Sequence, residues 1–263
     1  MLLGTQDRDF FPRDIEDRLR FVRDFGFDCF EIDGKLLMEQ SKQVAHAVQA
    51  SGIPVTTACG GYRGWIGDFI EERRLNGVED LKTILRCIRD VGGTGVVVPA
   101  AWGMFTHRLP PMVSPRSRKG DRKALLASLD ALEPVAEEQG VFIYLEPLNR
   151  YQDHMLNTAA DAVALIEAGG YSHVRLTFDF YHMNIEEDNM CRTIQRYADR
   201  IGHVHIAENH RYQPGTGSID FGTLIGALRQ SGYCGPLINE GRIRGDDPEK
   251  AYRDSIAYVR QFL

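Results

Sequence analysis

The chain lacks the features that mark several specialised classes of protein. It has only five cysteines in 263 residues, and no two of them form a C-x-x-C pair, so neither structural zinc nor redox work is indicated. The formal net charge is -6, which leaves no basic field to attract a phosphate backbone. No apolar run approaches the length of a membrane-spanning helix. We therefore expect free thiols, no nucleic-acid partner and no membrane partner.

The first residues, MLLGTQDRDF, also lack the basic stretch and apolar segment of a secretory signal, so a cytoplasmic protein is expected. The composition, 43% hydrophobic and 26% charged, is that of an ordinary globular protein. Neither a linker nor a low-complexity tract divides the chain. Because its length is close to the roughly 250 residues of an eight-stranded α/β barrel, residues 1–263 are expected to form one domain.

Short runs typical of buried strands alternate with longer stretches of helical period, eight times along the chain. This pattern predicts an α/β fold of the TIM (β/α)8 barrel type. The expected strands span residues 2–5, 28–33, 54–59, 95–100, 141–147, 174–180, 203–208 and 236–240. The expected helices span residues 14–24, 39–50, 71–90, 121–139, 159–168, 189–199, 221–230 and 248–262.

Glycine and proline mark the ends of these elements. Pro134 lies inside the fourth predicted helix and is expected to kink or split it. A proline-containing segment, residues 100–120, follows the fourth predicted strand, and a loop of this length is typical of a lid or a binding loop. Five glycines are expected in the left-handed conformation just past a helix: Gly26, Gly52, Gly140, Gly169 and Gly232.

Polar side chains end four of the predicted strands, where each apolar run stops. The carboxyl ends of parallel barrel strands form one ring, so these side chains are expected to face one another across the mouth of the barrel. The four residues are Glu146, Asp179, His205 and Glu240.

Three carboxylates packed together repel one another unless a cation neutralises them, so the cluster indicates a bound divalent metal ion. The donor set fits Mn²⁺ best, with Mg²⁺, Co²⁺ or Fe²⁺ as alternatives, and Zn²⁺ fits less well. Taken singly, each residue could instead cap a strand or join a salt bridge. His203 is the rival ligand, but it lies two residues deeper on the same strand face and is expected to hydrogen-bond behind the site.

Several motifs carry a resemblance to a known family. LEPLNRYQDHMLNT, FDFYHMNIEED, GHVHIAENHRYQPGTG and NEGRIR are similar to the D-tagatose 3-epimerase branch of the xylose-isomerase-like barrel superfamily, whose four metal ligands have the same spacing. ACGGYRGWIGDFIEERRLNG, VVPAAWGMF and RLPPMVSPRS resemble members of it that act on 3-keto glycosides. The resemblance implies a small sugar or glycoside as partner, a dimer or tetramer, and substrate contacts from His182 and Arg211.

The resemblance also implies a reaction, inversion at C4 of a 3-dehydro hexoside such as 3-dehydro-D-guloside to 3-dehydro-D-glucoside. A neighbouring ketone acidifies the C–H bond, and a metal ion stabilises the enediolate that forms. Glu146 and Glu240, on opposite faces of the substrate, would remove and return the proton. Asp179 and His205 would act as ligands alone.

One position departs from the family. Ketohexose 3-epimerases carry a glutamate where this chain has Gln152, which disfavours a free ketohexose and favours a glycoside. Trp65 and Trp102 are placed to stack on the apolar face of a sugar, although each could simply pack in its loop.

Three alternatives stay open. A ketose 3-epimerase of the D-tagatose, D-psicose or ribulose type, or a related isomerase, would use the same carboxylates. A non-catalytic sugar-binding barrel would have the same fold. A DNA-repair barrel with three zinc ions is disfavoured, because the third and fourth predicted strands contain no histidine.

Overall fold

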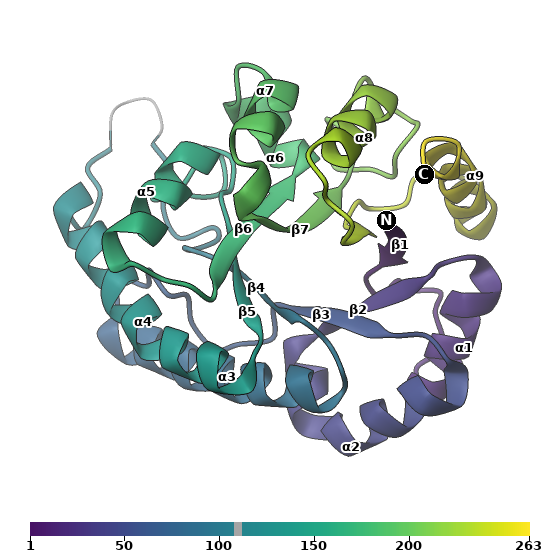
Figure 1. Ribbon diagram of the computed structural model, residues 1–263, viewed down its shortest axis with the longest axis horizontal. Helices are drawn as coiled ribbons and strands as arrows, with labels where there is room; N and C mark the ends of the chain where they lie inside the picture. Colours follow the sequence, from purple (N-terminus) through teal and green to yellow (C-terminus); the bar gives the residue numbers. More distant parts are fainter. Residues whose placement is uncertain (108–111) are drawn as a thin grey trace.

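The computed structural model, which describes residues 1–107 and 112–263, is built around a closed parallel barrel with strands in the order β1 to β8 (Figure 1). The barrel closes where β1 pairs with β8, as the register Leu2 to Pro236 and Thr5 to Asn239 records. The predicted barrel fold is thus confirmed. The strands are β1 (Leu2–Thr5), β2 (Cys29–Asp33), β3 (Val55–Cys59), β4 (Gly95–Pro99), β5 (Phe142–Glu146), β6 (Val174–Asp179), β7 (Ile201–Ile206) and β8 (Pro236–Asn239).

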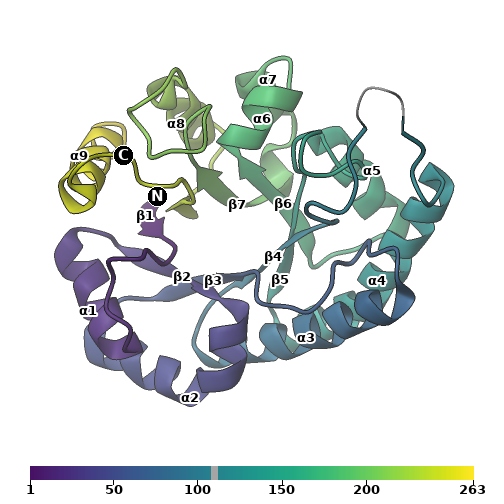
Figure 2. The same cartoon turned by 180° about the vertical axis from the view of Figure 1, so that it is seen from behind.

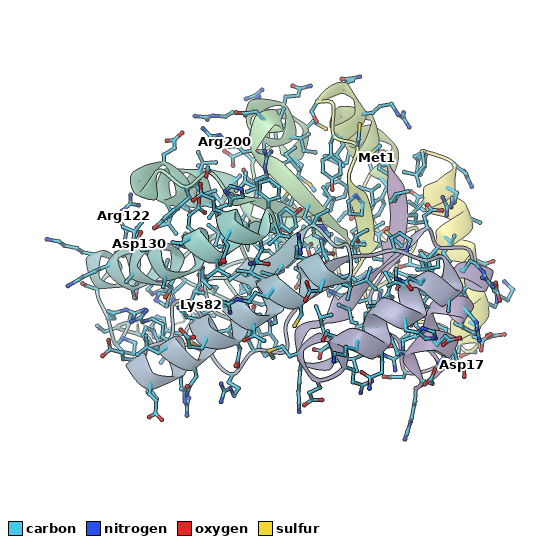
Figure 3. The ribbon with its side chains drawn as sticks, turned by 60° about the horizontal axis from the view of Figure 1, so that its bottom comes forward. Met1, Asp17, Lys82, Arg122, Asp130 and Arg200 are labelled. Atoms are coloured by element: carbon cyan, nitrogen blue, oxygen red, sulfur yellow. The ribbon has the colours of Figure 1, made fainter. Side chains whose placement is uncertain are left out.

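Helices surround the barrel, as the view from behind also shows (Figure 2). Their apolar faces pack on the strands, while charged side chains such as Asp17 and Arg122 lie on the outer surface (Figure 3). The helices are α1 (Ile15–Phe25), α2 (Gly34–Ser51), α3 (Glu71–Asp90), α4 (Arg118–Gln139), α5 (Ala159–Gly169), α6 (Phe180–Glu186), α7 (Met190–Arg196), α8 (Phe221–Gln230), α9 (Pro248–Arg260) and a 3₁₀ turn (Ala198–Arg200).

Helices α2 and α6 depart most from the sequence prediction. α2 begins five residues earlier than expected, because the Asp33 carboxylate accepts from the backbone N–H of Leu36 and caps it. It contains a non-helical residue, Gln40, close to the predicted start. α6 was not predicted at all, because it is two turns long and lacks its own apolar period.

The helix ends agree with most of the predicted caps. Gly26, Gly52 and Gly140 take the left-handed conformation at the ends of α1, α2 and α4. The prediction for Gly169 is wrong, because α5 extends through it and Gly170 is the left-handed cap. Gly232 is left-handed but follows Ser231, which caps α8.

Helix α4 runs unbroken through Pro134, so the predicted split is wrong. It begins at Arg118, after Ser117 accepts from the backbone of Gly120. The long segment before it is only partly described, since residues 108–111 lie outside the described residues. The lid assignment therefore stays a prediction. Within the described ranges, no helix combines the length and apolar character needed to cross a membrane.

Candidate metal centre

The four strand-end residues lie together at one end of the barrel. Glu146 and Asp179 are the last residues of β5 and β6, and His205 on β7 is paired in register with Asp179. Glu240 directly follows β8, where its backbone N–H donates to Ile206 at 3.1 Å. Each residue offers a ligand atom, and these atoms all lie within 4.8 Å of one another. The parallel topology, not sequence proximity, brings them together.

Burial and neighbouring charges together shift the pKa values in this cluster. Burial raises the pKa of Glu146 to about 7, and repulsion from Glu240 adds to the rise although a hydrogen bond to His205 opposes it. Burial acts the same way on Glu240, but the positive charges of Arg211 and His205 outweigh it and hold the Glu240 pKa well below its usual value. Burial lowers the pKa of His205, yet the surrounding carboxylates win and raise it well above its ordinary value.

Asp179 performs two tasks with its two oxygens. Oδ1 accepts from the backbone N–H groups of Tyr181 at 2.7 Å and His182 at 3.2 Å, which caps the start of α6. Oδ2 faces the cluster and pairs with the guanidinium of Arg211. The unpredicted helix α6 therefore starts from a residue of the cluster itself.

Arg211 supplies the fixed positive charge beside the carboxylates. Its Nη2 lies 2.6 Å from Glu240, and its guanidinium also stacks on the ring of Tyr181 at 4.9 Å. Its backbone is left-handed, with φ 63°, a conformation that costs a non-glycine residue free energy. Hydrogen bonds from its N–H to Glu208 at 2.8 Å and from Arg242 to its carbonyl at 2.7 Å hold this conformation.

Glu208 shapes the loop that carries Arg211. This carboxylate is 1% exposed, and it accepts from the backbone N–H groups of Gly215 at 3.0 Å and Ile219 at 3.2 Å. One buried side chain thus closes the loop after β7 on itself.

The donor chemistry of the cluster fits a divalent ion. Oε2 of Glu240 lies 2.6 Å from both His205 and Arg211, yet it has no hydrogen bond of acceptable geometry within the described residues. A buried carboxylate oxygen of this kind requires a further partner. Three carboxylates and one imidazole match a hard or borderline cation.

His182, on α6, presents one nitrogen to the cluster. Its Nδ1 accepts from the backbone N–H of Asn149 at 3.0 Å, so in the neutral ring the proton is on Nε2. Nε2 lies 4.0 Å from Oδ2 of Asp179. Burial lowers the His182 pKa to about 4, which keeps the ring a neutral hydrogen-bond donor at neutral pH.

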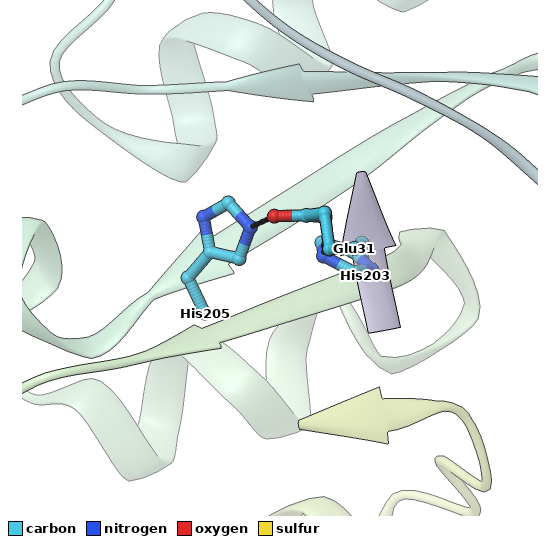
Figure 4. Close-up of side chains that lie close together, drawn as sticks. All are labelled: Glu31, His203 and His205. Carbon is cyan, nitrogen blue, oxygen red and sulfur yellow. Dashed lines mark hydrogen bonds and ion pairs between the residues drawn. The ribbon is translucent and has the colours of Figure 1, made fainter. Parts of the chain in front are cut away.

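Glu31 on β2 is a buried carboxylate next to the cluster, at 1% exposure. Its Oε1 lies 2.9 Å from Nε2 of His205, and its Oε2 lies 2.9 Å from Nε2 of His203 (Figure 4). His203 therefore contacts Glu31 behind the cluster. The attraction of the two histidines overcomes the effect of burial and holds the Glu31 pKa below its usual value.

The predicted aromatic contacts lie in the loops around this end of the barrel. Trp65 is half-buried and packs edge-on against Tyr62, with ring centroids 5.4 Å apart. The hydroxyl of Tyr62 is buried without a hydrogen-bond partner among the described residues. Burial raises the Tyr62 pKa well above its ordinary value, and the negative charges of Glu146 and Glu240 add to the rise.

Trp102 and Gln152 lie on neighbouring loops. Trp102 is 57% exposed, and Gln152 is half-buried. The backbone N–H of Gly103 donates to the carbonyl of Gln152 at 2.8 Å, which joins the loops after β4 and β5. Neither side chain belongs to the group of residues that could hold the metal ion.

Sequence reasoning missed Glu31, Asn149, Glu208 and the position of Tyr62. Glu31 carried a usable signal, because it is a single charge between the apolar residues Phe30 and Ile32 of a strand. The other three lie in loops, where residue type alone does not tell which groups a side chain contacts.

Comparison with known proteins agrees with this geometry. Residues 19–262 match the family described as xylose isomerase-like TIM barrel. The chain is 57% identical to 3-dehydro-D-guloside 4-epimerase of Escherichia coli (strain K12), over 99% of both chains. It is 35% identical to D-psicose 3-epimerase of Enterocloster bolteae, over 59% of this chain and 52% of that protein.

Solved structures give the same result. The crystal structure of an apo 3-keto-D-glucoside 4-epimerase from E. coli superposes with a TM-score of 0.98 at 57% identity, covering 99% of both chains. A structure of L-ribulose 3-epimerase superposes with a TM-score of 0.83 at 28% identity, covering 100% of this chain and 94% of that one. By sequence and by architecture, the chain belongs to the xylose isomerase-like TIM barrel family.

Proposed function

We propose that the chain is a sugar epimerase, an isomerase that inverts C4 of a 3-dehydro hexoside and interconverts 3-dehydro-D-guloside and 3-dehydro-D-glucoside. The observation that carries this proposal is the 57% identity over 99% of the chain to 3-dehydro-D-guloside 4-epimerase. The cluster of three carboxylates and one imidazole supports it independently, because the reaction requires both proton transfer and charge stabilisation beside a ketone.

We further propose that Glu146, Asp179, His205 and Glu240 hold one divalent metal ion, with Mn²⁺ preferred and Mg²⁺, Co²⁺ or Fe²⁺ as alternatives. The bound ion would supply Lewis-acid stabilisation of the negative charge that develops on the substrate oxygens. Binding would require Arg211 to release at least one of its carboxylate partners, Asp179 and Glu240.

Glu146 and Glu240 are proposed to move the proton. They come from β5 and the residue after β8, which lie on different arcs of the ring, so a sugar between them would present opposite faces to the two carboxylates. One carboxylate would take the C4 proton and the other would return a proton to the opposite face.

The neighbouring residues are proposed to bind and orient the substrate. His182 would donate from Nε2, because Asn149 occupies Nδ1. Arg211 would supply a fixed positive charge. Gln152 would contact a hydroxyl, and Trp65 and Trp102 would lie against the apolar face of the sugar.

The protein is further proposed to act in the cytoplasm as a dimer or tetramer. Exposed apolar side chains, among them Met112 and Val113, support contact between copies near the loops.

The test is exchange of the substrate C4 proton in deuterated water, followed by NMR. Metal-loaded protein is expected to incorporate deuterium at C4 of a 3-keto glucoside and of its C4 epimer. Free D-psicose, D-tagatose and L-ribulose carry the ketone at C2, and they should exchange their C3 proton much more slowly. Faster exchange with the free ketoses would contradict the substrate assignment, and no exchange with any keto sugar would contradict the epimerase itself.

The two carboxylates are distinguished by E146Q and E240Q, each with its metal content measured. Each variant is expected to lose exchange by at least about 100-fold, the usual contribution of a general acid or base. Among preparations that retain metal, E146Q should lose proton exchange with one C4 epimer of the substrate, and E240Q should lose it with the other. E138Q, at an exposed glutamate of α4, is the control and should behave like the parent.

A further inference from the structure

Glu31 is a buried acid in the middle of strand β2. The proposed reaction does not use it. Both of its oxygens are engaged by neighbours. Oε1 accepts from the side-chain amide of Gln6 at 2.8 Å and lies 2.9 Å from His205. Oε2 accepts from the hydroxyl of Thr57 at 2.6 Å and lies 2.9 Å from His203. Four side chains thus contact this one carboxylate.

Both ring nitrogens of His205 contact carboxylates. Nε2 faces Glu31, and Nδ1 faces the cluster, 3.3 Å from Glu146 and 2.6 Å from Glu240. Figure 4 shows the ring between β7 and the Glu31 side chain. A carboxylate accepts hydrogen bonds but cannot donate one. Because carboxylates face both nitrogens, the proposed ion decides between them: an ion at Nδ1 uses the lone pair of that nitrogen, which leaves the proton of the neutral ring on Nε2, where Glu31 accepts it.

We propose that Glu31 is a positioning residue for the metal centre, which holds His205 in the tautomer and orientation that present Nδ1 to the ion. The inference rests on the metal site of the proposed function. A metal-bound imidazole that donates its other N–H to a carboxylate binds its ion more strongly, because the carboxylate fixes the ring and increases its basicity.

His203 packs against both Glu31 and His205 inside the barrel. The rings of His203 and His205 meet edge-on with centroids 4.8 Å apart, and His203 stacks on Tyr144 at 5.5 Å. His203 and His205 are both fully buried. The carboxylate, both imidazoles and the tyrosine thus form one packed unit inside the barrel.

Glu31, His203 and His205 also have atoms close enough to hold an ion themselves. The hydrogen bonds disfavour this, because Gln6 and Thr57 already donate to the two oxygens of Glu31. Nε2 of His205 cannot both donate to Glu31 and bind a metal. One ion per chain is therefore expected, and two ions would overturn the inference.

The experiment is calorimetric titration of the chelator-treated protein with Mn²⁺. E31Q keeps the size of the side chain but removes its charge, and we expect its dissociation constant to rise by about 10- to 100-fold. T57V removes a hydrogen bond from the same carboxylate but leaves its contact with His205, so its affinity should stay close to that of the parent.

Metal-free thermal unfolding separates positioning from a general loss of structure. If Glu31 were purely structural, the loss of Mn²⁺ affinity would follow the loss of stability. E31Q and T57V would then bind Mn²⁺ equally whenever their unfolding temperatures are equal. That result would overturn the inference. E31D keeps the charge but has a side chain shorter by one methylene. Its Mn²⁺ affinity is expected to lie between those of E31Q and the parent.

A measurement on the parent protein needs no variant. In protein loaded with diamagnetic Mg²⁺, ¹⁵N-edited NMR should place the His205 proton on Nε2, and a proton on Nδ1 would overturn the inference. If the parent bound neither Mn²⁺ nor Mg²⁺, the proposed metal centre itself would be wrong. If the parent and E31Q bound Mn²⁺ equally, only the role of Glu31 would be wrong.

Discussion

At the residue scale, Asp153 is another buried acid outside the proposed metal centre, in the loop after β5. Its Oδ2 accepts from the backbone N–H of Leu156 at 3.0 Å. Its Oδ1 has no partner among the described residues and lies 3.7 Å from Nδ1 of His154, which also has none. Burial raises the pKa of Asp153 to about 6 from its ordinary 3.8.

This raised pKa predicts that D153N stabilises the protein at neutral pH. Between pH 3.8 and about 6 the folded chain holds a proton that the unfolded chain has lost, so stability falls as the pH rises through this window. Above it the full cost remains, at most about 3 kcal/mol by the usual conversion of 1.36 kcal/mol per pKa unit. Asparagine carries no charge and keeps an oxygen for Leu156.

Thermal unfolding across pH checks this prediction. D153N should unfold at a higher temperature than the parent at pH 7 to 8, and the difference should vanish near pH 4. D246N, at an exposed aspartate, should show no such pH-dependent gain. A gain of equal size at both pH values would show that the charge of Asp153 is not its cause.

The sequence predicts a side chain well when topology alone fixes its place. Glu146 and Asp179 end strands, so parallel pairing brings them together whatever the loops do. Asn149 depends on loop conformation, and its contact with His182 is visible only in three dimensions. Glu31 stands between these cases, since its strand was predicted but its two histidine contacts were not.

At the element scale, Gly61 fixes how the loop after β3 sits on the start of α2. Its φ is 78°, and a Cβ added there would lie 2.1 Å from the backbone nitrogen of Lys35. Gly52, at the end of α2, has a similar φ of 74° but open space around it. The two glycines share a left-handed backbone and differ in their surroundings.

This pair predicts unequal costs for the same substitution. G52A should lower the free energy of unfolding by about 1 kcal/mol, because alanine disfavours the left-handed region. G61A should cost clearly more, because the backbone of α2 must also move. Denaturant unfolding of both variants measures the difference, and equal costs would mean that the close approach to Lys35 is unimportant.

Helices and strands were predictable where the apolar pattern in the sequence is long and where residues near each end mark the boundary. α3 and α8 have the predicted bounds, because in each the helix extends over the same residues as the apolar period in the sequence. α6 was missed because its start depends on the side chain of Asp179, not on a local apolar pattern. The predicted split at Pro134 is wrong because helix α4 continues through it, while the predicted kink stays a prediction.

At the scale of the whole molecule, the alternation of strands and helices was sufficient to predict the barrel. Each parallel strand needs a covering helix, and eight such units close on themselves. Only the closed ring brings β2 to within reach of β7, so the contact between Glu31 and His205 is a property of the complete barrel.

Metal binding is expected to stabilise this whole barrel. At a free Mn²⁺ concentration 100 times the dissociation constant, the free energy of unfolding should rise by about 2.7 kcal/mol if the unfolded chain does not bind. Chemical unfolding with and without a chelator measures the gain. E240Q, which lacks one proposed ligand, should gain less at the same Mn²⁺ concentration, and an unchanged parent would contradict the metal site.

Arg211 gives the barrel a counter-ion of its own. Its guanidinium sits against Asp179 and Glu240, so the charge of these carboxylates is compensated within the polypeptide. We therefore expect the barrel to close before the proposed ion binds. Metal binding would then be a late step, and an arginine that leaves the carboxylates as the ion enters would already be in place to meet the sugar.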